Sequence, residues 1–319
     1  MSGPLDRILR KTGVPDLVEI LSDRIGATDL QSLLLEVYRR RAQAGSPGEL
    51  MERYAKNRFT SPSHVPAARQ LELDALALSL LPEGFEALDL SPVAPLGTTA
   101  IVTATSQNRL VSTVRNTEVA ADSTNAMALE CALRRRALLA SDPKSTACVK
   151  LAASQRLVRA QKVEGAGRFS HFRLFGLCSA GRDTGSFEFE LSQLREHVDF
   201  HVRLLEAWRD RGARFGRVLV PITPLEGGPG EDLLVARAIE PLASAHPGAV
   251  LSIDDAREQG RDYYRSLCFK VYVESADDEN ARFEVGDGGP TDWTQQLVGS
   301  RKERLFISGL GSERLSGLV

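Results

Sequence analysis

The sequence predicts an α+β protein with a helical extension at its N-terminus. Two observations predict this class. Residues 1–57 carry apolar residues at the three- and four-residue spacing of amphipathic helices. From residue 58 onward, helical segments mix with strand pairs instead of alternating strictly with single strands. We therefore expect an N-terminal helical extension over residues 1–57 and a larger unit over residues 58–319.

Composition and charge exclude several classes of protein. Lys and Arg number 40 and Asp and Glu 42, so the 319-residue chain has a formal charge of −2, which argues against a nucleic-acid-binding protein. No stretch reaches the ~18 apolar residues that a membrane span needs. The first residues lack the apolar core of a secretory signal, so we expect a cytoplasmic protein. Four cysteines without a CxxC pair predict buried free thiols.

The N-terminal extension divides into short amphipathic segments. They cover residues 5–13, 14–25, 27–45 and 47–57. Thr28 and Asp29 are typical of a helix start, because their side chains can accept hydrogen bonds from free backbone N–H groups. Arg39–Arg41 are expected on a solvated helix face rather than at a phosphate site. No residue of this extension indicates chemistry.

The larger unit begins with a helix and continues with mixed elements. Helices are predicted over residues 66–82, 124–140 and 189–212. Strands are predicted within residues 85–95, 99–105, 109–115, 149–163, 168–182, 215–222, 269–275 and 281–299 and at the start of 304–315, which then enters a helix. The residues Glu164–Gly167 indicate a turn that pairs two of these strands. A loop is expected over residues 223–232, which are rich in Gly and Pro.

Seven segments in sequence order carry a resemblance to a known family. They are LDLSPVAP (88–95), VAADSTNAMALECALRRR (119–136), LVRAQ (157–161), GRFSHFRLFG (167–176), REQGRDYYRSLCFKVYVE (257–274), DGGPTDWTQQLVG (287–299) and FISGLGSERL (306–315). In this order they resemble the motifs of class II aminoacyl-tRNA synthetases, in the histidyl form. The resemblance implies a class II synthetase-like antiparallel sheet flanked by helices over residues 58–319, and a homodimer.

The same resemblance implies ATP-dependent activation of a carboxylate, with ATP and Mg²⁺ bound. Arg159 would hold the α-phosphate, Arg314 would stack on adenine and reach the γ-phosphate, and Arg168 would lie near the distal phosphates. Arginine suits this work, because its guanidinium stays charged, grips phosphate oxygens in a fork and stacks on a purine. The alternative is that each is a surface arginine at the end of a strand or helix.

Four further residues match the family's substrate site. Asp122 and Thr124 occupy the acid-x-Thr positions that hold the ammonium group of an amino acid. Asp122 could equally cap the helix that follows it. Tyr263 and Tyr264 match the paired tyrosines of the substrate motif, although aromatic residues at the start of a strand are more often part of the core.

The sequence departs from the family at the positions that read histidine and catalyse its activation. A glutamate two residues after the motif 2 arginine is here Gln161, and the family's catalytic arginine is here Gln259. Arg257 and Arg261 lie close to Gln259 and could replace it only with a shift of register. The positions that read the substrate, a glutamine and a glutamate in the family, fall on Leu174 and Cys178. The pocket has therefore lost polar contacts for histidine. Near the next strand, Pro290 and Thr291 replace an arginine and a tyrosine of the family.

Two functions follow from these comparisons. The first is a synthetase-like paralogue that binds ATP and a small amino acid or carboxylate other than histidine, forming an acyl-adenylate for a small acceptor or carrier protein. The second is a non-catalytic regulatory subunit, like that of ATP phosphoribosyltransferase. The sequence ends five residues after Arg314, so we expect no anticodon-binding domain and no tRNA partner. His197 and His201 have the i,i+4 spacing of metal ligands, but without an accompanying glutamate we expect them on a solvent-facing helix.

Overall fold

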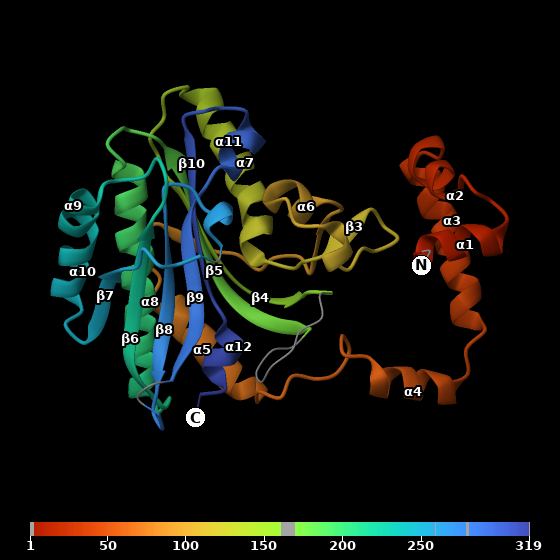
Figure 1. The fold of residues 1–319 in the computed structure, drawn as a ribbon, viewed down its shortest axis with the longest axis horizontal. Coiled ribbons are helices and arrows are strands. Elements are labelled where there is room, and N and C mark those ends of the chain that lie inside the picture. The colour runs from red at the N-terminus through yellow and green to blue at the C-terminus, as the bar shows by residue number, and fades with distance from the viewer. Residues whose placement is uncertain (1–2, 161–169, 259, 279–280, 319) are drawn as a thin grey trace.

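The centre of the fold is an eight-stranded sheet (Figure 1). The structure is a computed structural model that describes residues 3–160, 170–258, 260–278 and 281–318. The strand order is β1-β4-β5-β10-β9-β8-β6-β7. The strands are β1 (Phe85–Ala87), β4 (Val149–Val158), β5 (His171–Arg182), β6 (Phe215–Pro224), β7 (Ala249–Ile253), β8 (Leu267–Ser275), β9 (Arg282–Thr291) and β10 (Glu303–Leu310). The six inner strands pair antiparallel, and only the edge strands β1 and β7 run parallel to their neighbours. The predicted α+β class and the mostly antiparallel sheet are confirmed.

Helices cover both faces of the sheet (Figure 1). One face carries α5 (Ala67–Ser79), α8 (Glu188–Asp210) and α12 (Ser312–Ser316), and the other carries α7 (Ser123–Ser141) and α11 (Trp293–Val298). Successive side chains of β5 point to opposite faces, so Phe175 belongs to the core beneath α8 while Cys178 belongs to the core beneath α7. At Gly176 a Cβ atom would lie 2.5 Å from Ser123 Oγ. Glycine here lets the start of α7 approach the sheet closely, beside the candidate site.

The N-terminal segments form the predicted helices. They are α1 (Pro4–Thr12), α2 (Leu17–Glu19), a π-helical turn (Ile20–Arg24), α3 (Ala27–Gln43) and α4 (Pro47–Lys56). Figure 1 shows them to one side of the molecule, apart from the sheet, and none of their described residues is buried. The helix start that we expected at Thr28 and Asp29 lies slightly earlier, because α3 follows Gly26 directly. The division into two units at residue 57 stays a prediction.

Two of the predicted strands are wrong. Residues 98–103 form the helix α6 (Thr98–Thr103), and residues 109–115 are irregular apart from one bridge between Ser112 and Glu118. The β-branched composition favoured strands here, but the buried carboxylate of Glu118 accepts the backbone N–H groups of Gly97 and Thr99, both at 2.9 Å. A contact from outside the segment thereby stabilises the first turn of a helix. A short two-stranded sheet, β2 (Val93–Pro95) with β3 (Thr117–Val119), places Glu118 opposite that turn.

Further elements were not predicted from the sequence. The segment between β6 and β8 contains α9 (Glu231–Leu234), a π-helical turn (Val235–Ile239) and α10 (Glu240–Ala245) before the edge strand β7. Two 3-10 turns, Gln107–Arg109 and Arg261–Tyr263, lie beside the candidate site. The turn predicted over residues 164–167 lies outside the described residues, but β4 and β5 pair as predicted, from Val149 with Ala180 to Val158 with His171.

The expectation that His197 and His201 face solvent is wrong. Both side chains are fully buried on α8, which lies along the sheet. Burial lowers the pKa of His201 to about 3 and lowers that of His197 well below its usual value, so both imidazoles are neutral. The sequence predicted an exposed position for these polar residues because their partner Ser308 is more than a hundred residues away in the chain.

The structure also bears on the predicted thiols and on membrane insertion. All four cysteines are free, and three of them, Cys131, Cys178 and Cys268, are buried as predicted, whereas Cys148 is exposed. Within the described residues, no helix combines the length and the apolar character required to cross a bilayer.

Candidate functional site

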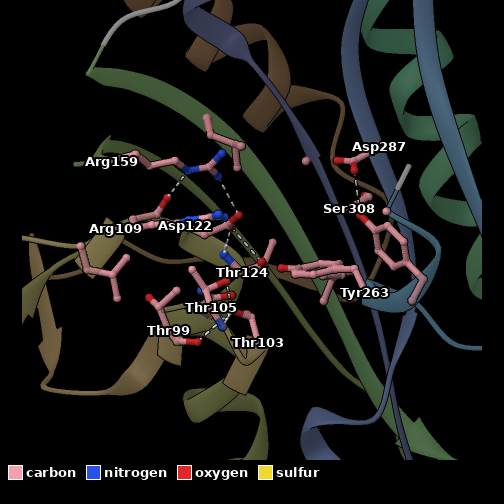
Figure 2. A pocket seen from close by; sticks show the side chains of 18 residues that line it. Thr99, Thr103, Thr105, Arg109, Asp122, Thr124, Arg159, Tyr263, Asp287 and Ser308 are labelled. Carbon is pink, nitrogen blue, oxygen red and sulfur yellow. Dashed lines mark hydrogen bonds and ion pairs between the residues drawn. The ribbon is translucent and has the colours of Figure 1, made fainter. Parts of the chain in front are cut away.

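A cavity of about 330 Å³ lies between the inner strands of the sheet and the segments that precede α7 (Figure 2). Its size is at the lower end of small-molecule pockets, which typically measure ~300–1,000 Å³. The lining residues are Thr99, Thr103, Thr105, Arg109, Leu110, Ala121, Asp122, Thr124, Asn125, Arg159, Leu174, Gly260, Tyr263, Tyr264, Asp287, Ile307, Ser308 and Gly309. Five residues selected from the sequence are therefore brought together here: Asp122, Thr124, Arg159, Tyr263 and Tyr264.

Arg159 lies directly after β4 and is fixed by three contacts. Its Nε donates to the carbonyl of Ala121 at 3.0 Å, and its Nη2 donates to Asp122 Oδ2 at 3.2 Å. Its guanidinium lies 4.9 Å from the centre of the Phe172 ring, within the range of a cation–π contact. The guanidinium is still about a third exposed (36%), so it can meet a ligand without giving up this position.

Asp122 both caps a helix and reaches the cavity. Its Oδ1 accepts the backbone N–H of Thr124 at 2.9 Å and the Thr124 hydroxyl at 2.8 Å, at the start of α7. Its Oδ2 faces Arg159. The capping alternative from the sequence is thus confirmed, and with three hydrogen bonds the carboxylate is already well occupied.

A second guanidinium in the cavity was missed from the sequence. Arg109 ends a 3-10 turn, and its carbonyl accepts the backbone N–H of Ala160 at 2.9 Å, which ties this turn to the residue after Arg159. In the described part of the chain, the Arg109 side chain makes no hydrogen bond or ion pair. A lone arginine in a turn has no distinguishing sequence pattern, so only the fold could place it beside Arg159.

Two tyrosines form an aromatic wall of the cavity. Tyr263 contacts Tyr264 and Trp293 edge to face, with ring centres 5.0 and 5.5 Å apart. Burial raises the pKa of both tyrosines well above the usual value, so their hydroxyls stay protonated. Tyr264 belongs to the buried core as well as to the lining. Both tyrosines line the cavity, and Tyr264 is also part of the core; their contact with a substrate stays a prediction.

Asp287 on β9 was not singled out from the sequence, and it lines the same wall. Tyr264 donates its hydroxyl to Asp287 Oδ2 at 3.0 Å. Burial raises the pKa of Asp287, with a smaller contribution in the same direction from Glu284, while the Tyr264 hydroxyl and Arg257 act in the opposite direction. In the sequence this residue lies in a glycine-rich stretch, GDGG, within the segment predicted to contain a strand, and no pattern there marked it as a site residue.

The floor of the cavity rests on a buried polar chain. Ser308 Oγ lies 2.8 Å from both His197 Nδ1 and His201 Nε2, and His197 Nε2 lies 2.9 Å from Ser179 Oγ. The Ser308 hydroxyl can donate to only one of the two imidazoles, so at least one ring must donate to it. The neutral histidines thus hold in place a hydroxyl that lines the cavity.

The remaining predicted residues lie elsewhere. Arg314 on α12 is exposed, does not line the cavity, and donates to the backbone carbonyl of Glu284. Leu310 of β10 pairs with Phe175, near the start of β5, so Arg314 lies at the end of the sheet where β4 ends. Arg168 is outside the described residues.

Of the positions where the sequence departs from the family, some line the cavity and others do not. Leu174 lines the cavity, and Cys178 is buried with its Sγ 3.7 Å from the carbonyl of Thr124. Arg257 is buried and Arg261 exposed, and neither lines the cavity. Gln161 and Gln259 lie outside the described residues. Leu174 therefore presents an apolar side chain to the cavity.

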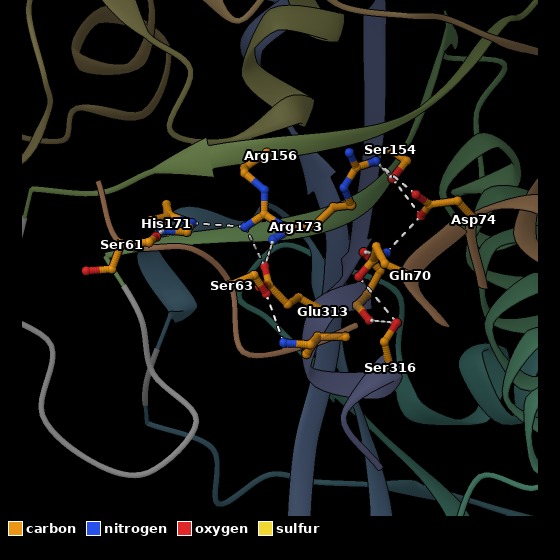
Figure 3. A network of polar contacts seen from close by, with 12 residues as sticks. Ser61, Ser63, Gln70, Asp74, Ser154, Arg156, His171, Arg173, Glu313 and Ser316 are labelled. Carbon is orange, nitrogen blue, oxygen red and sulfur yellow. Dashed lines mark hydrogen bonds and ion pairs between the residues drawn. The ribbon is translucent and has the colours of Figure 1, made fainter. Parts of the chain in front are cut away.

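A polar network holds the β4–β5 pair from the face opposite α7 (Figure 3). Glu313 is buried, and it accepts from Arg156 Nη1 at 3.0 Å, from the backbone N–H of Arg173 at 2.8 Å and from the Ser63 hydroxyl. Arg156 also donates to His171 Nδ1 at 2.9 Å. Since a guanidinium has no acceptor, His171 must carry its proton on Nε2, which lies 2.6 Å from the carbonyl of Ser61. This network fixes the strand that carries Arg159.

Comparison with known proteins shows the fold. No protein-family sequence model matches the chain, and no curated protein matches its sequence. The solved structures that match include apo histidyl-tRNA synthetase from S. aureus, with 13% identity, TM-score 0.54, and coverage of 77% of this chain and 63% of that one. An ATP phosphoribosyltransferase regulatory subunit/histidyl-tRNA synthetase from Bacillus halodurans matches with 14% identity, TM-score 0.57, and coverage of 80% and 82%.

A third match is a histidine–tRNA ligase subunit from Alicyclobacillus acidocaldarius, with 15% identity, TM-score 0.52, and coverage of 79% of this chain and 93% of that one. This chain spans less than two thirds of the S. aureus enzyme. The mostly antiparallel sheet of this chain agrees with the fold that the sequence resemblance implied. The chain has the catalytic-core fold of the class II aminoacyl-tRNA synthetases, as found in histidyl-tRNA synthetases and their regulatory-subunit relatives.

Proposed function

We propose that this protein is a synthetase-like paralogue that binds ATP and a small amino acid or carboxylate other than histidine, and forms an acyl-adenylate. The observation that carries the proposal is a single cavity of amino-acid size that holds two guanidinium groups and two carboxylates. The acyl group would pass to a small molecule or a carrier protein rather than to tRNA. By the family resemblance, the active form would be a homodimer.

The cavity suits a zwitterion. Arg109 and Arg159 supply positive charge for a ligand carboxylate, and Asp122 and Asp287 supply acceptors for an ammonium group. Leu174 offers no hydrogen bond to an imidazole, which supports a ligand other than histidine.

Activation needs positive charge where the carboxylate meets the α-phosphate. A carboxylate oxygen attacks the α-phosphorus, and the bond to pyrophosphate breaks as negative charge builds up on the α-phosphate oxygens. Arg159 is the residue best placed to stabilise that charge, because it is preorganised by Ala121, Asp122 and Phe172. Arg314, at the same end of the sheet, is the second candidate for contact with ATP.

Magnesium would accompany ATP. Among the described residues, no three His, Cys, Asp or Glu side chains gather into a metal site. Mg²⁺ is usually held by substrate phosphates and one or two carboxylates. The ion would neutralise part of the phosphate charge. No residue of this chain is assigned to it.

One observation supports a second candidate, a non-catalytic regulatory subunit. The Bacillus halodurans protein, whose name includes the regulatory subunit of ATP phosphoribosyltransferase, is matched over 82% of its length. Glutamines stand at the two sequence positions, 161 and 259, where the synthetase family has an acidic and a basic residue. A regulator would co-purify with a phosphoribosyltransferase and show no pyrophosphate exchange that depends on an amino acid.

Isothermal titration with ATP and Mg²⁺ tests the proposal. The wild-type protein should bind ATP, and R159A and R314A should each weaken binding about 10- to 100-fold, because a charge-assisted hydrogen bond contributes ~1.5–3 kcal/mol. The matched control is R214A. It removes an exposed arginine that pairs with Asp277 and does not line the cavity. Absence of ATP binding, or binding that both site variants leave unchanged, would contradict the proposal.

A further inference from the structure

We propose that Asp287 selects the substrate, and that the cavity takes an amino acid whose side chain carries a second, protonated amine. The inference rests on the proposed function and narrows its substrate class. The carboxylate of Asp287 would bind the side-chain ammonium group while the other end of the ligand meets Arg109 and Arg159.

The charges of the cavity are separated. Figure 2 shows Arg109, Arg159 and Asp122 on one side and Asp287 on the other, beside Ser308. A ligand that satisfies both sides must carry its anionic group and a cationic group at opposite ends. An amino acid with an amine-bearing side chain has that distribution, whereas one with an aliphatic side chain offers nothing to Asp287.

Of the two carboxylates in the lining, Asp287 is the less occupied. Asp122 accepts three hydrogen bonds, two from Thr124 and one from Arg159. Asp287 accepts one, through Oδ2 from Tyr264, and its Oδ1 has no partner among the described residues. A carboxylate has about four acceptor sites, so Asp287 has capacity for an ammonium group.

The wall around Asp287 is built to hold the carboxylate in place. A Cβ atom at Gly289 would lie 2.8 Å from Tyr264 Cδ1, so only glycine allows Tyr264 to lie against β9. That position brings the Tyr264 hydroxyl to Asp287 Oδ2. Tyr263 adds an aromatic ring beside the path to Asp287, and aromatic faces attract ammonium groups.

The electrostatic surroundings favour a cationic ligand. Glu284 and Asp122 add negative charge that acts on Asp287, and Arg257 is the one positive neighbour among the groups that shift its titration. Asp287 is half-buried and accepts one hydrogen bond among the described residues, so its charge is incompletely compensated in the free cavity. An ammonium group at Oδ1 would compensate that charge, and a methyl group in its place would not.

Titration calorimetry with matched amino acids tests this inference. Wild-type protein should bind L-lysine or L-ornithine at least about 10-fold more tightly than L-norleucine, which has similar length and no side-chain charge. D287N keeps the acceptor for Tyr264 but removes the charge, so it should weaken lysine binding more than norleucine binding and abolish this preference. The control D292N alters a carboxylate outside the cavity that pairs with Arg265, and it should keep the preference.

The wild-type protein provides a second test that needs no variant. Lysine affinity should fall as pH is lowered and Asp287 becomes protonated, while norleucine affinity should change less. Equal affinity for lysine and norleucine would overturn the inference and leave the proposed function standing. Binding of no amino acid at all would overturn both.

Discussion

Two carboxylates, the buried Glu118 on β3 and the half-buried Asp287 in the cavity lining, have pKa values shifted in opposite directions. Burial raises the pKa of Glu118 on β3, but hydrogen bonds from Thr99, Gln107 and Gly97 outweigh it, and the pKa ends below its usual value. Burial also raises the pKa of Asp287 on β9, and the single hydrogen bond from Tyr264 does not compensate. The number of donors, rather than burial, decides the sign.

The comparison separates a carboxylate that stabilises the fold from one that is available to bind a ligand. Glu118 uses both oxygens to hold the turn that starts α6 and brings Thr99 to the cavity. Asp287 keeps one oxygen without a partner in the described part of the chain. A satisfied carboxylate stabilises the fold, whereas an unsatisfied one costs stability that a ligand can restore.

The largest expected effect is that of E118Q. The amide NH₂ group would face donors that now bond to a carboxylate oxygen, so the free energy of unfolding should fall by about 2–3 kcal/mol. Urea unfolding measures the change. The matched control is E86Q, because Glu86 is an exposed carboxylate that pairs with Arg134, and loss of its charge should lower the free energy of unfolding far less. Equal effects of the two variants would contradict the role given to Glu118.

A smaller effect of opposite sign is expected for D287N. Asparagine keeps the acceptor for the Tyr264 hydroxyl and removes a desolvated charge, so the ligand-free protein should become more stable by about 1 kcal/mol at neutral pH. Thermal unfolding without ligand measures this gain. A loss of stability would mean that the charge of Asp287 is already compensated in the free protein.

The smallest effects should appear in how the stability differences between wild type and the variants E118Q and D287N depend on pH. Glu118 has a lowered pKa, so its contribution is full above about pH 4.5 and is lost as pH falls through the lowered value. Asp287 has a raised pKa, so the folded protein binds more protons than the unfolded chain between pH 3.8 and the raised value. The advantage of D287N should therefore shrink as pH falls through that window.

Urea unfolding of wild type, E118Q and D287N between pH 7 and pH 3 distinguishes these cases. The difference in free energy of unfolding between wild type and E118Q should disappear only at the acidic end of this range. The difference between D287N and wild type should begin to shrink at higher pH. Two differences that disappear together would contradict the opposite shifts assigned to the carboxylates.

Much of the sheet was predictable from the sequence, because apolar periodicity reports which face of a strand or helix is buried. The β4–β5 pair and α7 follow this rule. The prediction for residues 98–103 was wrong, because their β-branched composition favours a strand. Glu118 instead stabilises a helix there through hydrogen bonds that no local sequence pattern reveals. The predicted exposure of His197 and His201 was wrong for the same reason, because their partner Ser308 lies far away in the chain.

The site was predictable where it coincides with family motifs. Asp122, Thr124, Arg159 and the paired tyrosines line one cavity, although their roles there stay predictions. Arg109 and Asp287 have no such pattern, because a turn arginine and an aspartate among glycines are common in any sequence. Only the three-dimensional arrangement shows that their charges face a shared cavity.

The most direct test of the proposed function is pyrophosphate exchange into ATP across a panel of amino acids. The proposal predicts exchange that requires Mg²⁺, is strongest with an amine-bearing side chain, is weak with histidine and is lost in R159A. No exchange with any amino acid, together with a stable complex with a phosphoribosyltransferase, would contradict it and select the regulatory function.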